Sequence, residues 1–370
     1  MKPPLSRILR ILALLAAAVL VLSLPVLLTP QEAAIPGTEA TERTLLRIWT
    51  VNAPGGAQAW LTAQLRTWEK QHPGVMTYLR QVSPEELADP EAVLPDMVLY
   101  MPGDITAPEE LFLPLSGEMP VREALLRCGR WQGEQYGLPL CWGAWVLAID
   151  SAAEPGAATT PAPTTLLGRP AATPMVSSTE APYPLEGVSR ADCTLRSPGG
   201  AALLTLMRTL GGALPPLPEG FGQSSAPAVY AAFQARTCAS AMLTTGQVTA
   251  LEGLVSAGKT SAFRVMTAEE IITDQVWLAS LTPGTAPASA QLLGWLVSRD
   301  GQETLSTQGL HTVREDLTLY AAGTPARVEQ AAQRALSAVN AYIPAEDVSS
   351  AAWQVLQGRM DFSQALLPLL

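Results

Sequence analysis

Four tryptophans stand at the ends of predicted strands, and they are the residues of this sequence best placed for binding chemistry. Open α/β sheets bind ligands beyond the carboxyl ends of their strands. An indole at that edge offers a flat apolar face to a sugar or another amphipathic ligand, and Asn52 and the turn at Gly55 would add polar contacts. A single tryptophan is more often packed in a core, so both interpretations stay open for each ring. The four are Trp49, Trp142, Trp145 and Trp277.

Patterns typical of catalysis or metal binding are missing from the sequence. Neither His72 nor His311 stands in H-E-x-x-H or pairs with cysteine at zinc-ligand spacing. No G-x-S-x-G or G-x-G-x-x-G occurs, and the G-x-x-x-x-G-K-T at 253–260 does not directly follow a predicted strand, as a phosphate-binding loop would. An S-x-x-K at 256–259 lacks the S-D-N and K-T-G that accompany it in penicillin-binding enzymes. We therefore expect a protein that is not an enzyme and has no metal or cofactor; an exported hydrolase is the least favoured alternative.

Strands that alternate with helices must position the tryptophans. An apolar run at 45–51 predicts a strand that ends in a turn at 52–56. A helix at 57–71 follows, with apolar residues every three to four positions. Strands at 75–79 and 96–101 continue the alternation, which requires parallel pairing and an α/β lobe. Further predictions are a hairpin at 130–139, strands at 142–149, 239–244 and 276–281, and helices at 201–210, 227–235, 288–298, 302–308, 325–342 and 349–356.

The start of the chain predicts export. Three basic residues among the first ten are followed by residues 11–28, none of which is charged. Basic residues before an apolar run are typical of a signal peptide or an N-terminal anchor. The run approaches the ~20 residues that span a bilayer, which favours an uncleaved anchor, although cleavage stays open. We assign residues 1–30 to this signal peptide or signal anchor and residues 31–43 to a polar linker.

Composition limits the remaining possibilities. A chain of 370 residues with 48% hydrophobic content is long enough for two lobes of ordinary size. Its net charge of −10 argues against nucleic acid as a partner, since such binding needs clustered lysine and arginine. An even number of cysteines in an exported chain permits disulfides, but their spacing selects no pairing and they also suit a buried core. The cysteines are Cys128, Cys141, Cys193 and Cys238.

Several motifs, taken in order, resemble those of one bacterial family, the extracellular solute-binding proteins of ABC importers, family 1, the sugar-binding type. Residues 68–75, W-E-K-Q-H-P-G-V, are similar to the family's F-E-K-x-H-P-G-I/V at the end of its first helix. The P-D-M-V at 95–98 resembles its third strand, and G-E-Q-Y-G-L-P at 133–139 resembles G-K-x-Y-G-L-P. Residues 232–242 resemble F-x-x-G-K-A-A-M, and residues 288–314 resemble the F-x-x-W-L-x-S-x-E-x-Q … G-x-x-P-x-R segment.

The resemblance implies an α/β, two-lobed, periplasmic-binding-protein-like fold of type II with crossing hinge strands, preceded by an N-terminal hydrophobic helix. Lobe 1 would comprise residues 44–142 with 265–320, and lobe 2 residues 143–264 with 321–370. Crossings are expected near 141–144 and 263–267. The ligand would lie between the lobes and contact Trp49, Asn52, Gly55, Trp142, Gly143, Trp145, Trp277 and, on lobe 2, Gln247.

The function implied is capture of a sugar or other small polar solute for an ABC importer by hinge closure. The partners would be that solute, the importer's permease and the membrane that holds the N-terminal helix, and we expect a monomer outside the cytoplasm. Departures from the family are Gln247, where an aromatic residue is usual, and the lack of a lipid-anchoring cysteine after the apolar run. They leave open an alternative: a membrane-anchored sensor or structural protein with a degenerate binding-protein fold and no transport role.

Overall fold

The structure is a computed structural model, and it describes residues 43–151 and 199–370 except 88, 90–92, 210–223 and 239. It also gives the backbone of three short strands, β8 (Gly168–Arg169), β9 (Thr173–Pro174) and β10 (Leu195–Arg196). The predicted signal segment and nearly all of the linker lie outside the described residues. Within the described part, none of the helices combines the length and the apolar content that crossing a membrane requires. Residues 44–370 form one compact unit.

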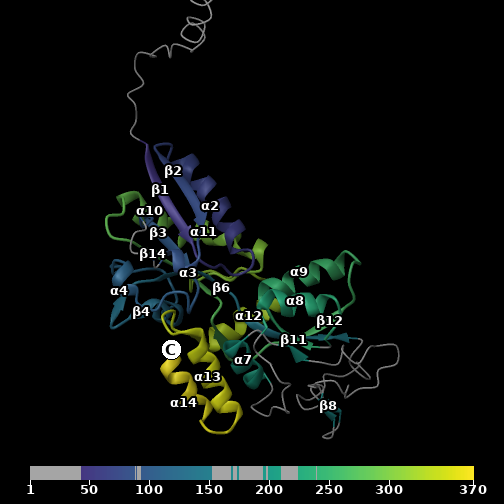
Figure 1. Cartoon of the computed structure of the whole chain (residues 1–370). Coiled ribbons are helices and arrows are strands. Elements are labelled where there is room, and N and C mark those ends of the chain that lie inside the picture. The colour runs from purple at the N-terminus through teal and green to yellow at the C-terminus, as the bar shows by residue number, and fades with distance from the viewer. Residues whose placement is uncertain are drawn as a thin grey trace, which may run out of the picture. The chain divides into compact units, whose positions relative to one another are not determined.

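A five-stranded sheet, called the first sheet below, consists of β1 (Thr44–Thr50), β2 (Val75–Gln81), β3 (Met97–Tyr100), β6 (Leu138–Trp142) and β14 (Val276–Leu281). Its order is β2-β1-β3-β14-β6 (Figure 1). β1 lies parallel to both β2 and β3, as the strand–helix–strand pattern predicts. β14 lies antiparallel between β3 and β6, a placement that the local sequence pattern did not reveal.

Helix α2 (Ala57–Gln71) packs on the first sheet through its apolar stripe. The helix begins after Gly56, whose positive φ of 86° turns the chain out of β1, and ends before Pro73. Trp60 is buried on this stripe and donates its indole N–H to the Gly301 carbonyl at 3.0 Å. The stripe therefore holds α2 against two late segments, α11 (Arg299–Gln302) and η4 (Glu303–Gln308).

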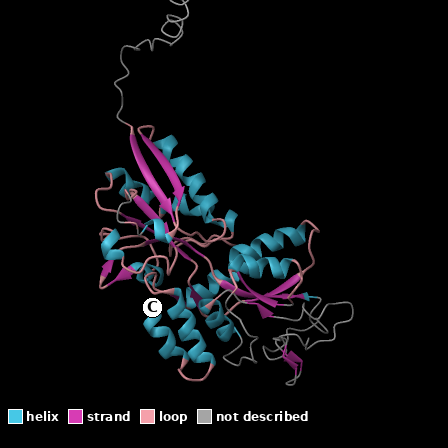
Figure 2. Ribbon diagram, in the orientation of Figure 1, coloured by secondary structure: helices cyan, strands magenta, loops and turns pink. Residues whose placement is uncertain are grey.

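A four-stranded sheet, called the second sheet below, consists of β7 (Trp145–Asp150), β10, β11 (Ser240–Thr244) and β12 (Phe263–Met266), in the order β10-β11-β7-β12. β7 runs antiparallel to both of its neighbours. Helix α8 (Ala226–Gln234) packs on β11, and α9 (Thr245–Ser256) follows β11 directly. Helix α7 (Gly200–Thr209) packs on β7 and carries α13 (Ala345–Leu356) on its other side (Figure 2).

The chain passes between the two sheets three times. It leaves the first sheet between β6 and β7, returns between β12 and β14, and leaves again after η4. Gly143 ties the first two crossings together, because its N–H donates to the Gln275 carbonyl and its carbonyl accepts from the Thr273 hydroxyl, both at 2.7 Å. Trp142 and His311 tie the first to the third by exchanging two backbone hydrogen bonds, of 3.2 and 2.8 Å.

The C-terminal region differs from the sequence prediction. The helix expected at 325–342 is wrong in its second half, because α12 (Gly323–Arg334) ends where Ala335 becomes extended. The next residues form β15 (Leu336–Ala338), which pairs parallel with β13 (Ile271–Thr273) in the second crossing. Helix α14 (Phe362–Leu366) then packs on α13. Long-range pairing has overridden a helical pattern here.

Other predictions made from the sequence agree better with the observed elements. The hairpin is confirmed as β4 (Arg130–Trp131) and β5 (Glu134–Gln135). The strand expected at 142–149 is interrupted at Gly143 and Ala144, since the chain changes sheet there. The remaining described elements are α3 (Pro84–Leu87), α4 (Pro108–Leu111), α5 (Glu123–Leu126), η1 (Arg127–Gly129), α10 (Pro287–Leu296) and η5 (Leu367–Leu369).

Two tryptophans of α2 give a matched test of this packing. Trp60 and Trp68 are both buried on the same stripe, but only Trp60 has a hydrogen-bond partner for its indole nitrogen. Trp60→Phe leaves the Gly301 carbonyl without its donor, which should cost about 1–3 kcal/mol more than Trp68→Phe does. Urea unfolding of the two variants measures the difference. Equal losses would contradict this role for Trp60.

Candidate functional site

The candidate site lies at one edge of the first sheet. Because β1, β3 and β6 run in the same direction and β14 runs against them, three strand ends and the start of β14 share this edge. The residues that follow the strand ends are Asn52 in the turn before α2, Asp104 after β3, and Gly143 after β6. This is the edge at which open α/β sheets bind ligands.

Asn52 and Asp104 form the polar centre of this edge. The exposed Asn52 donates its side-chain amide to Asp104 Oδ1 at 2.7 Å, and the Met101 N–H donates to Asp104 Oδ2 at 2.8 Å. Burial raises the pKa of the Asp104 carboxyl, and these two hydrogen bonds act in the opposite direction. Together the two side chains present an amide and a carboxylate that can bind hydroxyl groups.

The four predicted tryptophans are buried in this structure, with exposed fractions of 7% for Trp49, 1% for Trp142, 3% for Trp145 and 0% for Trp277. Three of them use the indole N–H internally: Trp142 donates to the Thr312 carbonyl, Trp145 to Asp274 Oδ1 and Trp277 to the Asn52 carbonyl, at 2.7–2.9 Å. Trp49 lies under the Arg80 guanidinium, 5.5 Å from the ring centroid. The ligand contacts expected of these rings stay a prediction, which the observed packing does not favour.

On the second sheet, the corresponding edge is where β11 ends and α9 begins. Thr244 caps this helix by accepting from the Gln247 N–H at 3.3 Å. Gln247 returns the contact, since its Oε1 accepts from the Thr244 N–H, and its amide nitrogen donates to the Ala226 carbonyl at 3.0 Å. Both ends of the Gln247 amide thus have structural partners. Its predicted role in ligand binding stays untested.

Gly143 and Gly55 lie where backbone is close to neighbouring segments. Gly143 is buried in the first crossing, and a Cβ added there would lie 3.4 Å from the Thr245 hydroxyl. Gly55 is exposed in the turn before α2, and its carbonyl lies 3.4 Å from where a Cβ of Gly246 would be. The turn before α2 and the start of α9 therefore meet, so that the two sheets present one joint edge.

Sequence reasoning missed Asp104 and Asp274. Asp274 is half-buried in the second crossing, where its Oδ1 accepts from Trp145 at 2.7 Å and from the Gln275 amide at 2.9 Å. Burial raises the pKa of the Asp274 carboxyl, against these hydrogen bonds. The signal for Asp104 was present, since it follows the strand at 96–101 in a Pro-Gly-Asp turn. No local signal marked Asp274.

A buried polar cluster lies below the edge, at the third crossing. The His311 ring stacks on Trp142 with centroids 4.5 Å apart and meets Tyr320 edge-on at 5.3 Å. Its Nδ1 lies 3.5 Å from Glu329 Oε1 on α12. Burial lowers the pKa of the His311 imidazole, a shift that Glu329 opposes and the positive charge of Arg122 reinforces. The third crossing therefore contains a buried histidine whose surroundings favour the neutral form.

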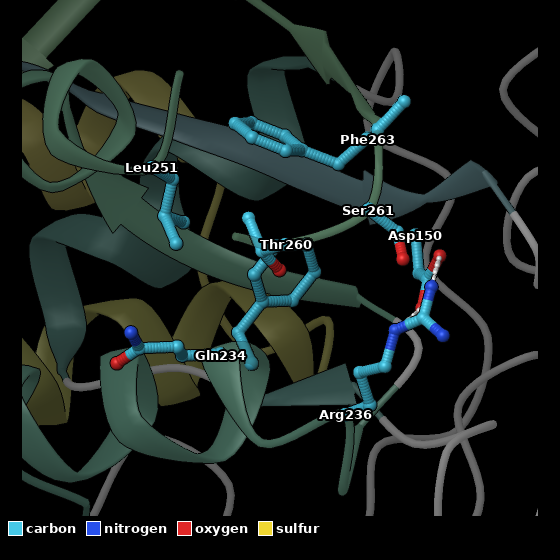
Figure 3. Close-up of a pocket in the computed structure, with 9 residues that line it drawn as sticks. Asp150, Gln234, Arg236, Leu251, Thr260, Ser261 and Phe263 are labelled. Atoms are coloured by element: carbon cyan, nitrogen blue, oxygen red, sulfur yellow. Dashed lines mark hydrogen bonds and ion pairs between the residues drawn. The ribbon is translucent and has the colours of Figure 1, made fainter. Parts of the chain in front are cut away.

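A separate shallow pocket lies at the far end of β7 (Figure 3). Its polar end is occupied by an ion pair in which Arg236 Nε lies 3.3 Å from Asp150 Oδ2. Its apolar part includes Phe233 and Phe263, which meet edge-on at 5.9 Å. Because Asp150 ends β7 whereas Trp145, which pairs with Thr244, begins it, this pocket is distinct from the candidate site.

Metal and thiol chemistry find no support among the described residues. In this part of the chain, no three His, Cys, Asp or Glu side chains are grouped so that they could hold a metal ion. Cys128, Cys141 and Cys238 are all buried, as expected for cysteines in a core. Burial raises the pKa of the Cys128 and Cys141 thiols. Cys193 lies outside the described residues.

Comparison with known proteins places the fold. No family model matches the sequence and no curated protein is similar to it. The GacH receptor of Streptomyces glaucescens, solved unliganded and with acarbose, has 14% identity and a TM-score of 0.60 over 88% of this chain and 96% of that chain. The mannotriose-bound protein CpMnBP1 has 16% identity and a TM-score of 0.57 over 88% of this chain and 99% of that chain.

The maltose/maltodextrin-binding domain MalE of Bdellovibrio bacteriovorus, bound to maltotriose, is similar as well. It has 14% identity and a TM-score of 0.54, over 88% of this chain and 97% of that chain. At such identities the likeness establishes the fold alone. The expected two-lobed, periplasmic-binding-protein-like α/β fold is therefore confirmed for the part of the chain that these alignments cover.

The neutral His311 predicts a pH-dependent stability. A histidine of the unfolded chain takes up a proton as pH falls through about 6.5, while the buried ring resists until lower pH. Stability present above pH 6.5 should therefore fall on acidification, with a slope of up to about 1.4 kcal/mol per pH unit. Urea unfolding between pH 7.5 and 5 should show a shallower decline for His311→Phe and for the polar variant His311→Asn.

The wild-type chain, unfolded in parallel at each pH, supplies the reference for this measurement. A decline as steep in both His311 variants as in wild type would show that other groups cause it.

Proposed function

We propose that this chain is an extracytoplasmic solute-binding protein of an ABC importer and that it captures a sugar or another small polar solute. The observation that carries the proposal is the similarity of fold to sugar-binding proteins over nearly their whole length, 96–99% of the three chains compared. The motifs at 68–75 and 133–139 support it independently, because they are sequence patterns and the similarity is structural. No reaction is part of the proposal.

The proposed mechanism is hinge closure. Lobe 1, residues 44–142 with 265–320, would carry the Asn52–Asp104 pair, and lobe 2, residues 143–264 with 321–370, would carry the start of α9. A ligand held by groups of both lobes gains those contacts only in the closed arrangement, and so shifts the population towards it. The crossings tied at Gly143 and His311 would act as the hinge.

The proposed partners follow from the same class of protein. A monomer outside the cytoplasm would deliver its solute to the permease of the importer. The basic and apolar segment at 1–30 would direct export and, if it stays uncleaved, hold the chain at the membrane through the linker at 31–43. No cofactor, metal or nucleic acid is part of this proposal.

A second candidate function is a membrane-anchored sensor or structural protein that keeps the fold without transport. The burial of the four tryptophans favours it, because the indole N–H groups of Trp142, Trp145 and Trp277 already donate to acceptors within the protein. A sugar-binding protein would be expected to keep at least one aromatic face for its ligand. The two candidates differ in whether any solute stabilises the chain.

A thermal-shift screen of the full chain over sugars, polyols, amino acids and peptides separates them. A ligand that binds only the folded state must raise the melting temperature; at a concentration of 100 Kd the gain is about 2.7 kcal/mol. Asn52→Ala should weaken binding of the active ligand about tenfold through loss of roughly 1.4 kcal/mol. Gln330→Ala, an exposed change on α12, should not.

The outcomes of the screen are distinct. Stabilisation by a solute, reduced in Asn52→Ala and retained in Gln330→Ala, supports solute binding at the proposed edge. Stabilisation that Asn52→Ala leaves intact would move the site elsewhere. No stabilisation by any class of ligand would reject the importer function and favour the second candidate.

A further inference from the structure

The turn before α2 and the start of α9 contact each other through glycines. A Cβ added to Gly246 would lie 3.4 Å from the Gly55 carbonyl oxygen and 3.5 Å from the Gln308 carbonyl oxygen. These are ordinary van der Waals distances, and Gly246 has no side chain to fill them. The backbone of one proposed lobe therefore comes within a single atom's width of the backbone of the other.

The start of the third crossing, at Gln308 and Gly309, also packs against these two glycine-containing segments. A Cβ on Gly56 would lie 2.8 Å from Gln308 Cβ, and a Cβ on Gly309 would lie 2.9 Å from Gly246 Cα. Gly56 and Gly309 also have positive φ values of 86° and 69°, which residues with a side chain rarely adopt. Glycines thus occupy the positions at which α2, α9 and the third crossing converge, and they permit a closer approach than any other residue would.

Such a contact restricts what the proposed cleft can hold. A ligand that runs across the cleft would have to pass between Gly55 and Gly246, where a single added Cβ would already be in van der Waals contact with the Gly55 carbonyl. The saccharides named for the similar structures include maltotriose and mannotriose, each of three linked rings. A three-ring chain in that orientation would require the two helix starts to separate, whereas a single ring beside the contact would not.

The chemistry of the neighbouring groups agrees with a small, hydrophilic ligand. Three residues before Gly55, the exposed Asn52 and the Asp104 carboxylate offer hydrogen-bond partners for adjacent hydroxyl groups. Stacking platforms for successive rings are not available from Trp49, Trp142 or Trp277, since all three are buried. Recognition at this edge would depend on hydrogen bonds to one compact polar molecule.

We infer that the glycine contact of Gly55, Gly246 and Gly309 limits the ligand of this protein to a single-ring sugar or a polyol of similar size, and excludes trisaccharides. The inference rests on the proposed function, because it specifies the solute that the same edge takes. It assigns to Gly246 a role in specificity: its missing side chain allows the lobes to close around a small ligand.

Ligand size is tested directly on the full chain by melting temperature and calorimetry. The single-ring probes are D-glucose, D-mannose and myo-inositol, and the three-ring probes are maltotriose and mannotriose. Stabilisation by a single-ring probe, with at least tenfold weaker binding of both trisaccharides, is expected. Trisaccharide binding as tight as that of any single-ring probe overturns the inference and leaves the proposed function intact. If neither class stabilises the chain, the inference fails, and the proposed function is then decided by the wider screen that includes amino acids and peptides.

Two matched variants on α9 test the contact itself. Gly246→Leu places a side chain between the helix starts, whereas Gly253→Leu lies on the same helix with no atom within 4 Å of its Cβ position. Both replace glycine by leucine within α9, Gly246 in its first turn and Gly253 in its interior. Gly246→Leu should weaken single-ring binding at least tenfold, and Gly253→Leu should change it less than twofold.

A distance measurement makes this test independent of any ligand. Spin labels at Ala59→Cys on α2 and Ala250→Cys on α9, both exposed positions, report the separation of the two helices. The chain without these changes, labelled in parallel, gives the background from its own cysteines. Gly246→Leu should lengthen the measured distance and Gly253→Leu should not. An unchanged distance in Gly246→Leu would show that the contact is absent in solution, and would overturn the inference.

Discussion

The hydrogen bonds of Gly143 are the constraint on which the arrangement of the two sheets depends. Its N–H and carbonyl bind the second crossing through Gln275 and Thr273. A side chain at this position would meet the Thr245 hydroxyl at 3.4 Å and Gln275 Cβ at 3.5 Å. These are ordinary van der Waals distances, so it is the two backbone hydrogen bonds that hold the crossings side by side. Their closeness brings the edge of the first sheet to the start of α9.

Much of the fold could be predicted from the sequence, because its elements have strong local signals. The stripe on α2 and the Gly-rich turn before it gave that helix its correct bounds, and the alternation with strands gave the parallel pairing of β1 with β2 and β3. What local patterns do not contain is the choice of distant partners. The antiparallel insertion of β14 and the pairing of β15 with β13 both depend on residues far away in the sequence.

The candidate site could be predicted only in part, for a related reason. Position at a strand end was visible for Asn52 and for the tryptophans, but burial depends on what covers each residue in three dimensions. Trp277 is a case in point: its side chain is fully buried, and its indole N–H donates to the Asn52 carbonyl. The tryptophan thus supports the polar edge from within. Asp274, which has no motif, emerged only because folding brings it to Trp145.

The order of strands in the first sheet has a consequence for how the chain matures. β14 lies between β3 and β6, so the sheet stays incomplete until residues 276–281 are available. Synthesis at about 5–20 residues per second would deliver β6 well before β14. Until then β3 keeps an open strand edge, and all four strands of the second sheet are made before that edge is filled. An open strand edge is a template for pairing with another chain, so late closure exposes the growing chain to aggregation until β14 is in place.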